Sequence, residues 1–228
     1  MITVVFFDAN GVLYDRHETP EAYALRLLAV RGYPSRISSV DNARLRTLHA
    51  RASTGQLTPK AYWDEFLRAY GVASAEARAE MATLILVRAH DVYEMPGTRA
   101  TLCALKRRGF TVGVITNTMH PPQWKRSWLE KIGVAEYVDV LVCSTEVGVE
   151  KPAPQIYLHA LNRASVLPSQ AVFVGHAPEE LEGARSLGMA TVAVNYAPGT
   201  RADFHIAALP DLLAIPILRR RSPDNPGA

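Results

Sequence analysis

The sequence predicts an α/β fold class, a doubly wound, mostly parallel sheet interrupted near its start by an all-helical insertion. Three observations support this prediction. A short apolar run rich in branched and aromatic residues, 4–7, begins the chain and has the composition of a buried strand. Similar runs alternate with helical segments from residue 93 onward, as in a sheet with helical crossovers. Residues 15–92, between these two parts, show helical periodicity without a strand pattern.

Composition limits the classes of function. The 228 residues are 48% hydrophobic and 21% charged, which is ordinary for a globular protein with a sizeable core. A formal net charge of +3 is too small to indicate a nucleic-acid partner. Arg219, Arg220 and Arg221 form a local basic cluster, but the tail of residues 219–228 is rich in Pro, Asn and Gly. We expect this tail to be disordered and solvated rather than a binding arm.

Cysteine usage and the N-terminal residues indicate a compartment. Cys103 and Cys143 lie far apart in apolar surroundings, as free thiols in a reducing environment do. The first residues lack the basic region and the cleavage site of a secretory signal, and no apolar run is long enough to span a membrane. We therefore expect a cytoplasmic protein with no membrane partner. The sequence does not indicate its oligomeric state.

The first strand ends on a polar group. Asp8 follows the apolar run 4–7, and Asn10-Gly11 favours a sharp turn directly after it. In open α/β sheets, ligands bind beyond the carboxyl ends of the strands. Asp8 is therefore a candidate nucleophile, although an Asp at this junction can also serve as a helix cap.

The insertion predicts four helices. Thr19-Pro20 and Thr58-Pro59 each combine an N-cap residue with a proline in the first turn. Ser74 is the corresponding cap of the last helix, and residues 62–70 carry an aromatic stripe at helical spacing. The predicted helices span residues 19–31, 40–52, 58–70 and 74–85.

The remaining chain alternates between strands and helices. Glycines 109 and 188 end two of the predicted helices, and a strand follows each of them. The predicted strands are residues 111–116, 138–143, 171–174 and 191–194, with an edge strand at 204–206. The predicted helices are residues 97–108, 122–132, 154–162, 178–187 and 209–218.

Four polar motifs lie at or beyond the predicted strand ends. They are Asp8, Thr116-Asn117, Lys151-Pro152 and Gly175-His176, and Lys151 lies within the sequence Gly-Val-Glu-Lys-Pro-Ala-Pro. In this order and spacing they resemble the haloacid dehalogenase (HAD) superfamily over essentially the whole chain. The resemblance implies a Rossmann-like core of residues 1–14 and 93–218. It also implies that residues 15–92 form a helical C1 cap, which closes over the site and selects the substrate.

The resemblance also implies the chemistry of the site. Asp8 would attack the substrate and form an ester intermediate, splitting one difficult step into two. Thr116 would donate to the growing negative charge, Asn117 would lie at the substrate or fix the local turn, and Lys151 would hold Asp8 and the substrate's charge. The expected reaction is hydrolysis of a small phosphorylated metabolite, and the expected partner is therefore a small anionic substrate.

Two residues depart from the family pattern. Asn10 stands where family phosphatases carry a second Asp as acid and base, and a carboxamide cannot exchange that proton. Its backbone carbonyl can still bind a metal ion. His176 stands where the family carries an Asp that binds Mg²⁺, an ion that prefers oxygen ligands. The candidate metal ligands are thus Asp8, Asn10, His176 and Glu180, although Glu180 is equally explained by the helix dipole.

These departures leave several hypotheses open. His176 can bind a softer ion such as Mn²⁺ or Zn²⁺, or can face the substrate's charge itself and make the reaction metal-independent. The site can also hydrolyse a carbon–halogen bond of a 2-haloacid, because a halide leaves without protonation. The Asp-x-Tyr-Gly-Thr and Ser-Asn motifs of such dehalogenases are absent from the sequence. The last alternative is a catalytically weak binding or regulatory protein.

Overall fold

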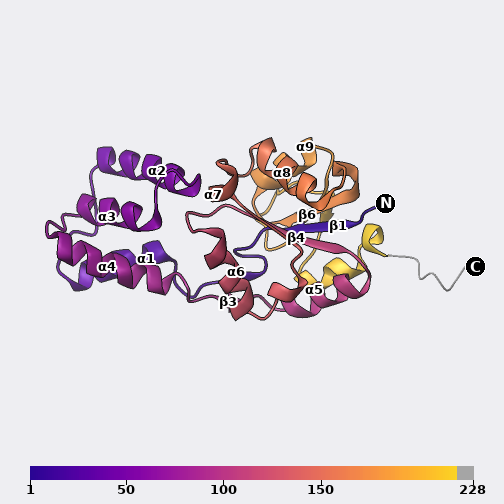
Figure 1. Ribbon diagram of the computed structural model, residues 1–228, viewed down its shortest axis with the longest axis horizontal. Coiled ribbons are helices and arrows are strands. Elements are labelled where there is room, and N and C mark those ends of the chain that lie inside the picture. The colour runs from indigo at the N-terminus through magenta and orange to yellow at the C-terminus, as the bar shows by residue number, and fades with distance from the viewer. Residues whose placement is uncertain (220–228) are drawn as a thin grey trace, which may run out of the picture.

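A parallel sheet forms the centre of the structure, a computed structural model that describes residues 1–219. The strand order is β5-β4-β1-β6-β7-β8, and each pair of neighbours is parallel. This arrangement confirms the predicted fold class, with the first strand at the centre (Figure 1). The strands are β1 (Val4–Phe7), β4 (Thr111–Thr116), β5 (Val140–Cys143), β6 (Ala171–Gly175), β7 (Ala190–Ala193) and β8 (Phe204–His205).

The alternation of side chains along β1 divides the core into two layers. Val5 and Phe7 belong to one buried apolar cluster, and Val4 and Phe6 belong to the other. Successive strand residues point to opposite faces, so a fully apolar strand must be covered on both sides. Gly113 of β4 leaves room for Phe6, because a Cβ at this glycine would lie 2.3 Å from the Phe6 ring.

Helices cover both faces of the sheet. The first cluster takes side chains from α5 and α6, and the second takes them from α8 and α9. Figure 1 shows α8 and α9 on one side of the sheet and α5 on the other. Each helix supplies an apolar stripe at helical spacing, as its sequence predicts. These helices are α5 (Thr98–Arg107), α6 (Pro122–Lys131), α8 (Pro154–Ala164) and α9 (Pro178–Ser186).

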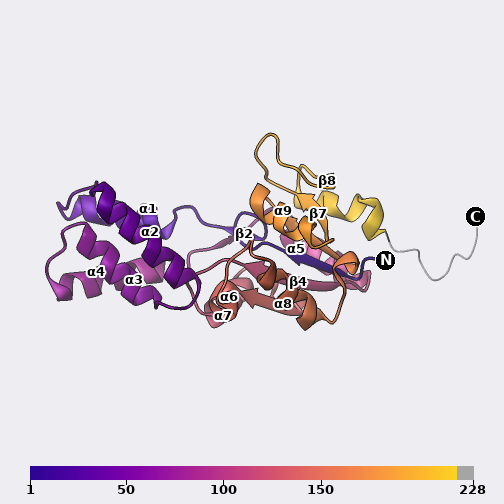
Figure 2. The same cartoon turned by 90° about the horizontal axis from the view of Figure 1, so that it is seen from above.

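Four further helices form a module with its own apolar core beside the sheet (Figure 2). Thr19 and Thr58 accept hydrogen bonds from Ala22 N and Ala61 N, which confirms the predicted caps. The aromatic stripe packs inward, and Trp63 is fully buried. The helices are α1 (Pro20–Val30), α2 (Ser39–Ser53), α3 (Pro59–Ala69) and α4 (Ala75–Arg88).

A two-stranded ribbon joins the chain where it enters and leaves the module. β2 (Tyr14–Asp15) pairs antiparallel with β3 (Tyr93–Glu94). The sequence analysis did not predict these short strands, since two residues are too few to show a period. The ribbon brings the two crossings side by side and so fixes where the module leaves the sheet.

Two predictions for the second half of the chain were wrong or incomplete. Residues 209–218 do not form an α-helix but two 3₁₀ segments, Leu209–Ala214 and Pro216–Leu218. Pro216 has no N–H to donate and its ring clashes with the preceding turn, which stops an α-helix there. A short helix, α7 (Ser144–Val147), follows β5 and was not predicted. In the first half of the chain, the helical spacing of residues 74–85 predicts that Leu84 faces inward, but its side chain is exposed.

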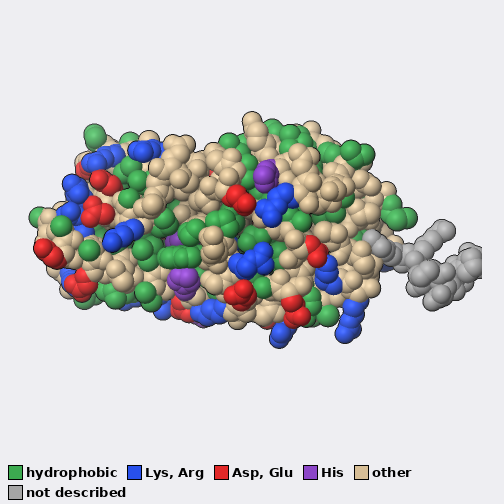
Figure 3. All heavy atoms as spheres, viewed as in Figure 1, with side chains coloured by type: hydrophobic (Ala, Val, Ile, Leu, Met, Phe, Trp, Pro, Cys, Tyr) green, Lys and Arg blue, Asp and Glu red, His purple; other side chains and the backbone are tan. Residues whose placement is uncertain are grey.

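The surface carries both signs of charge. On the face shown in Figure 3, Lys and Arg side chains are interspersed with Asp and Glu rather than gathered into one patch. Within residues 1–219, no helix has the length and apolar character needed to cross a membrane. The tail expected to be disordered lies, apart from Arg219, outside the described residues.

The module core leads to a stability prediction. Trp63 is fully buried and contacts the rings of Tyr62 and Phe66, each at 5.1 Å between centroids. We expect Trp63→Ala to lower the free energy of unfolding by about 3–5 kcal/mol, because it leaves a large cavity. Urea denaturation followed by circular dichroism measures this loss. The control Val87→Ala, at a side chain 66% exposed, should stay within about 0.5 kcal/mol of the parent. Equal effects of the two substitutions would contradict the packing described here.

Candidate active site

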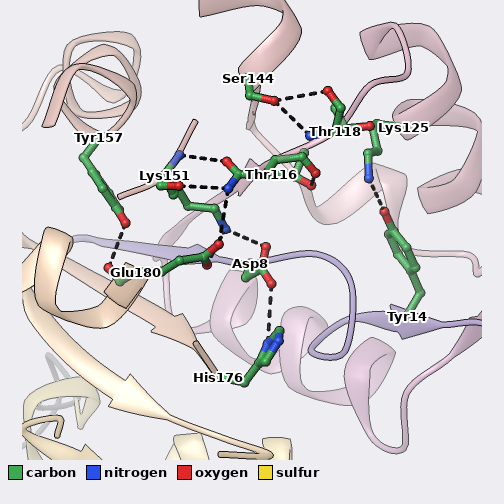
Figure 4. Close-up of polar contacts among 11 residues, drawn as sticks. Asp8, Tyr14, Thr116, Thr118, Lys125, Ser144, Lys151, Tyr157, His176 and Glu180 are labelled. Carbon is green, nitrogen blue, oxygen red and sulfur yellow. Dashed lines mark hydrogen bonds and ion pairs between the residues drawn. The ribbon is translucent and has the colours of Figure 1, made fainter. Parts of the chain in front are cut away.

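The residues of the four polar motifs lie close together at the carboxyl edge of the sheet (Figure 4). Asp8 follows β1, Thr116 ends β4 and His176 follows β6. β1 pairs with both other strands, so that Phe7 lies opposite Val114 on one side and Val174 on the other. Parallel pairing in this register brings the three strand ends together, and Figure 4 shows the resulting cluster around Asp8.

Lys151 joins the two carboxylates of the cluster. Its Nζ lies 2.6 Å from Asp8 Oδ1 and 2.7 Å from Glu180 Oε2. The Lys151 side chain is fully buried, and those of Asp8 and Glu180 are 10% and 12% exposed. Burial alone would lower the pKa of Lys151, but the two carboxylates outweigh it and raise the pKa above its ordinary value. Lys151 is therefore charged at neutral pH.

Asn117 fixes the backbone that carries Lys151. Its Oδ1 accepts a hydrogen bond from Lys151 N at 2.8 Å, and its Nδ2 donates to Lys151 O at 3.0 Å. The carboxamide thus spans both backbone groups of one residue and orients the lysine from the neighbouring strand end. Thr116 is buried at the end of β4, and its hydroxyl donates to Asn117 O at 3.3 Å. Thr116 and Asn117 were the predicted substrate-binding residues, and the side chain of Asn117 is hydrogen-bonded to the backbone of Lys151.

His176 faces the other oxygen of Asp8. Its Nδ1 lies 3.6 Å from Asp8 Oδ2, and its side chain is 39% exposed. Gly11, with φ +73°, lies against the imidazole, since a Cβ there would be 3.4 Å from His176 Cε1. The turn after β1 therefore makes room for the ring. One oxygen of Asp8 is held by Lys151, and the other points toward the imidazole (Figure 4).

The carboxamide of Asn10 is held by an arginine that the sequence analysis did not single out. Arg16 Nη1 donates to Asn10 Oδ1 at 2.8 Å, and its Nε and Nη2 donate to Ala89 O. Asn10 is itself exposed. Arg16 follows a short ribbon strand that has no sequence signature, so no periodic pattern could have marked it.

The comparisons with known proteins agree with this geometry. A family model for haloacid dehalogenase-like hydrolases matches residues 2–188. The chain belongs to the HAD-like hydrolase family. It is 29% identical over 203 residues to a glyceraldehyde 3-phosphate phosphatase of Methanopyrus kandleri, covering 85% of this chain and 84% of that protein. This result confirms the resemblance to the HAD superfamily that the four polar motifs indicated.

The proteins that this chain is similar to include a dehalogenase as well as phosphatases. (S)-2-haloacid dehalogenase 1 of a Pseudomonas species is 28% identical over 228 residues, covering 93% of this chain and 96% of that protein. The crystal structure of a HAD phosphatase from Thermococcus onnurineus superposes with a TM-score of 0.64 at 26% identity, covering 93% of this chain and 97% of that one. The chain is accordingly a hydrolase of the HAD-like family.

The donors at the expected metal position do not fit Mg²⁺. Asp8 Oδ2 and the backbone carbonyl of Asn10 supply oxygen, but His176 supplies nitrogen and Glu180 is held by Lys151. Mg²⁺ prefers an octahedron of oxygen ligands. Among residues 1–219, no three or more His, Cys, Asp or Glu side chains lie together in a position to hold a metal ion. The arrangement is closer to a set of ion pairs than to a Mg²⁺ site.

A second polar cluster, which the sequence did not indicate, lies near Asp8. Lys125 of α6 is buried, and its Nζ donates to Tyr14 OH at 2.8 Å. Burial first, and the nearby charge of Arg16 second, lower the pKa of Lys125 to about 7. The same burial lowers the pKa of His120 to about 3, which keeps this imidazole neutral. From sequence, Lys125 reads as a surface residue of an amphipathic helix.

The low pKa of Lys125 makes a prediction about stability. Its pKa is about 7 in the folded protein and about 10.5 when unfolded, so the unfolded chain binds more protons between these values. The stability of the parent, relative to Lys125→Met, should therefore rise as the pH increases from about 7 to about 10. Below pH 7 the relative stability should be constant.

Chemical denaturation of both proteins across this pH range measures the difference, in which titrations common to both cancel. Lys131→Met, on the exposed end of the same helix, is the control and should differ from the parent by a pH-independent amount. A flat difference for Lys125→Met would show that this lysine titrates normally.

Proposed function

We propose that this hydrolase cleaves a small phosphomonoester by way of a phosphorylated Asp8. The observation that carries the proposal is the position of Lys151, which holds Asp8 Oδ1 at 2.6 Å and leaves Oδ2, 3.6 Å from His176 Nδ1, free of the lysine. A carboxylate fixed through one oxygen presents the other for in-line attack. The phosphatase relative of Methanopyrus kandleri supports phosphorus as the atom attacked.

The first step transfers the phosphoryl group to the protein. Asp8 Oδ2 forms a bond to phosphorus while the bond to the substrate's leaving oxygen breaks. The Lys151 ammonium and the Thr116 hydroxyl stabilise negative charge around the attacked group. The leaving oxygen requires a proton, which the Asn10 carboxamide cannot provide. His176, whose Nδ1 lies 3.6 Å from Asp8 Oδ2, donates this proton to the leaving oxygen and becomes neutral.

The second step restores the enzyme. Water attacks phosphorus, the bond between Asp8 and phosphorus breaks, and inorganic phosphate leaves. His176 accepts the proton of the attacking water. These steps need no metal ion, and the imidazole in the donor set would suit Mn²⁺ or Zn²⁺ better than Mg²⁺.

We infer that the helical module, corresponding to the expected cap of residues 15–92, closes the site. A cavity of about 300 Å³ is lined by Asn117 and Lys125 from the core and by Pro20 and His49 from the module. A substrate that extends from Asp8 into this space would contact both parts. The module therefore selects the substrate while the core performs the reaction.

The nucleophile makes the most direct prediction. Asp8→Asn should lower kcat for p-nitrophenyl phosphate on the order of 10³-fold or more, as loss of a nucleophile does in other enzymes with covalent intermediates. Release of p-nitrophenol measures the rate, with chelator and separately with Mg²⁺, Mn²⁺ and Zn²⁺. The control Asp91→Asn removes a carboxylate 45% exposed and should not change kcat.

Acid-quenched parent enzyme should also gain the mass of one phosphoryl group on the peptide that contains Asp8. An Asp8→Asn variant with parental kcat, or a phosphoryl group on another residue, would contradict the proposal.

Dehalogenation is a second candidate because residue 10 is a carboxamide. A halide leaves without a proton, so a site with Asn10 lacks nothing for cleavage of a carbon–halogen bond. The 28% identity to (S)-2-haloacid dehalogenase 1 supports this alternative. Release of halide from a 2-haloacid, together with no release of phosphate from esters, would select it.

Asn10→Asp distinguishes the two candidates. The new carboxyl would lie beside Arg16 and could protonate a leaving oxygen, a contribution of about 10²–10⁴-fold in rate. We expect phosphatase kcat to rise on the order of 10²-fold, while halide release should not rise. Parallel assays of phosphate and halide release measure both effects, and Asn42→Asp in α2 is the matched control. An unchanged phosphatase rate would show that proton supply does not limit the reaction.

A further inference from the structure

Two basic side chains line the cavity between core and module. Arg16, Lys125 and Trp128 contribute to its wall, beside Asn10. Both basic groups lie close to the Trp128 ring: Arg16 Cζ is 4.6 Å from its centroid and Lys125 Nζ is 4.7 Å from it. Attraction to the ring favours a positive charge on either side chain.

Neither cation is neutralised by a carboxylate. Within residues 1–219, neither Arg16 nor Lys125 has an Asp or Glu oxygen within 4.0 Å of its side-chain nitrogens. Asp15 and Glu21 line the same cavity, Glu21 from the module, but they pair with neither. Burial lowers the pKa of Lys125 to about 7, so an anion bound in the cavity would favour its charged form. Arg16 is half-buried at the same cavity and is always charged.

The hydrogen-bond donors of the two side chains are only partly used. The ammonium of Lys125 has three N–H groups, and one donates to Tyr14 OH. The guanidinium of Arg16 has five, and its recorded bonds to Asn10 Oδ1 and Ala89 O use three. Arg16 also hydrogen-bonds the side chain of Tyr14, and the buried Lys125 uses one donor of its ammonium form. An anion in the cavity would accept from the remaining donors of Lys125 and Arg16, both of which line it.

We propose that Arg16 and Lys125 form a subsite for a second anionic group of the substrate, a carboxylate held away from the bond that Asp8 attacks. The inference rests on the proposed function and narrows its substrate class to phosphoesters of small acids. A planar carboxylate matches the fork of the guanidinium and accepts from the ammonium at the same time. Arg16 connects this subsite to Asn10, so that one side chain contacts both the turn after β1 and the substrate.

A pair of esters that differ in the carboxylate alone tests this subsite. Phosphoglycolate carries a carboxylate where ethyl phosphate carries a methyl group. Isothermal titration into Asp8→Asn protein, which does not turn over, should show phosphoglycolate binding at least about tenfold more tightly, the effect expected of a hydrogen-bonded charge pair. Adding Lys125→Met, or Arg16→Gln, should reduce this ratio to near one and change the affinity for ethyl phosphate by less than about twofold.

Lys131→Met, on the same helix but outside the cavity, is the matched control and should keep the ratio. A ratio near one in the starting protein, or a ratio retained in both cavity variants, would overturn the subsite and leave the proposed function in place. Failure of both esters to bind would overturn the proposed function and the subsite with it. The two cavity variants act independently, so the test stands if either of them fails to fold.

Discussion

The active site depends on one buried ammonium group shared by two carboxylates. Lys151 lies between Asp8 and Glu180, and its charge is what permits two acidic groups to remain close together at the edge of an apolar sheet. Removing Lys151 would leave two buried carboxylates without a counter-charge, which is strongly destabilising, whereas removing either carboxylate would leave one ion pair in place. Asn117 fixes the backbone of the lysine from the neighbouring strand. The trio therefore ties catalysis to the geometry of the sheet.

Around this trio the charges are arranged differently from the family pattern. A carboxamide at position 10 is paired with Arg16, and an imidazole at position 176 faces the nucleophile. Arg16 and Lys125 line the cavity together with the carboxylates of Asp15 and Glu21, so the cavity carries groups of both signs. At the sheet edge, the imidazole at position 176 and the pairing of Glu180 with Lys151 leave few oxygen donors for a hard metal ion.

Much of the fold follows from local patterns. The apolar strand 4–7, the Thr-Pro caps and the aromatic stripe around Trp63 each dictate one element, because burial and capping are local requirements. Local signals were insufficient where an element is too short or interrupted. The ribbon strand β2 has two residues, and Pro216 interrupts an apparent amphipathic helix, which forms two 3₁₀ segments instead.

The sequence by itself determined the candidate groups of the site: Asp8, Thr116 and His176 end or follow predicted strands, and Lys151 was indicated by its resemblance to the HAD motif. Only the tertiary structure decided which of them pair with one another. In the folded chain Glu180 pairs with Lys151. Arg16 and Lys125 line one cavity although they lie more than a hundred residues apart in the sequence. Side-chain pairing across such separations depends on how helices and loops pack, and no periodic pattern in a single chain encodes it.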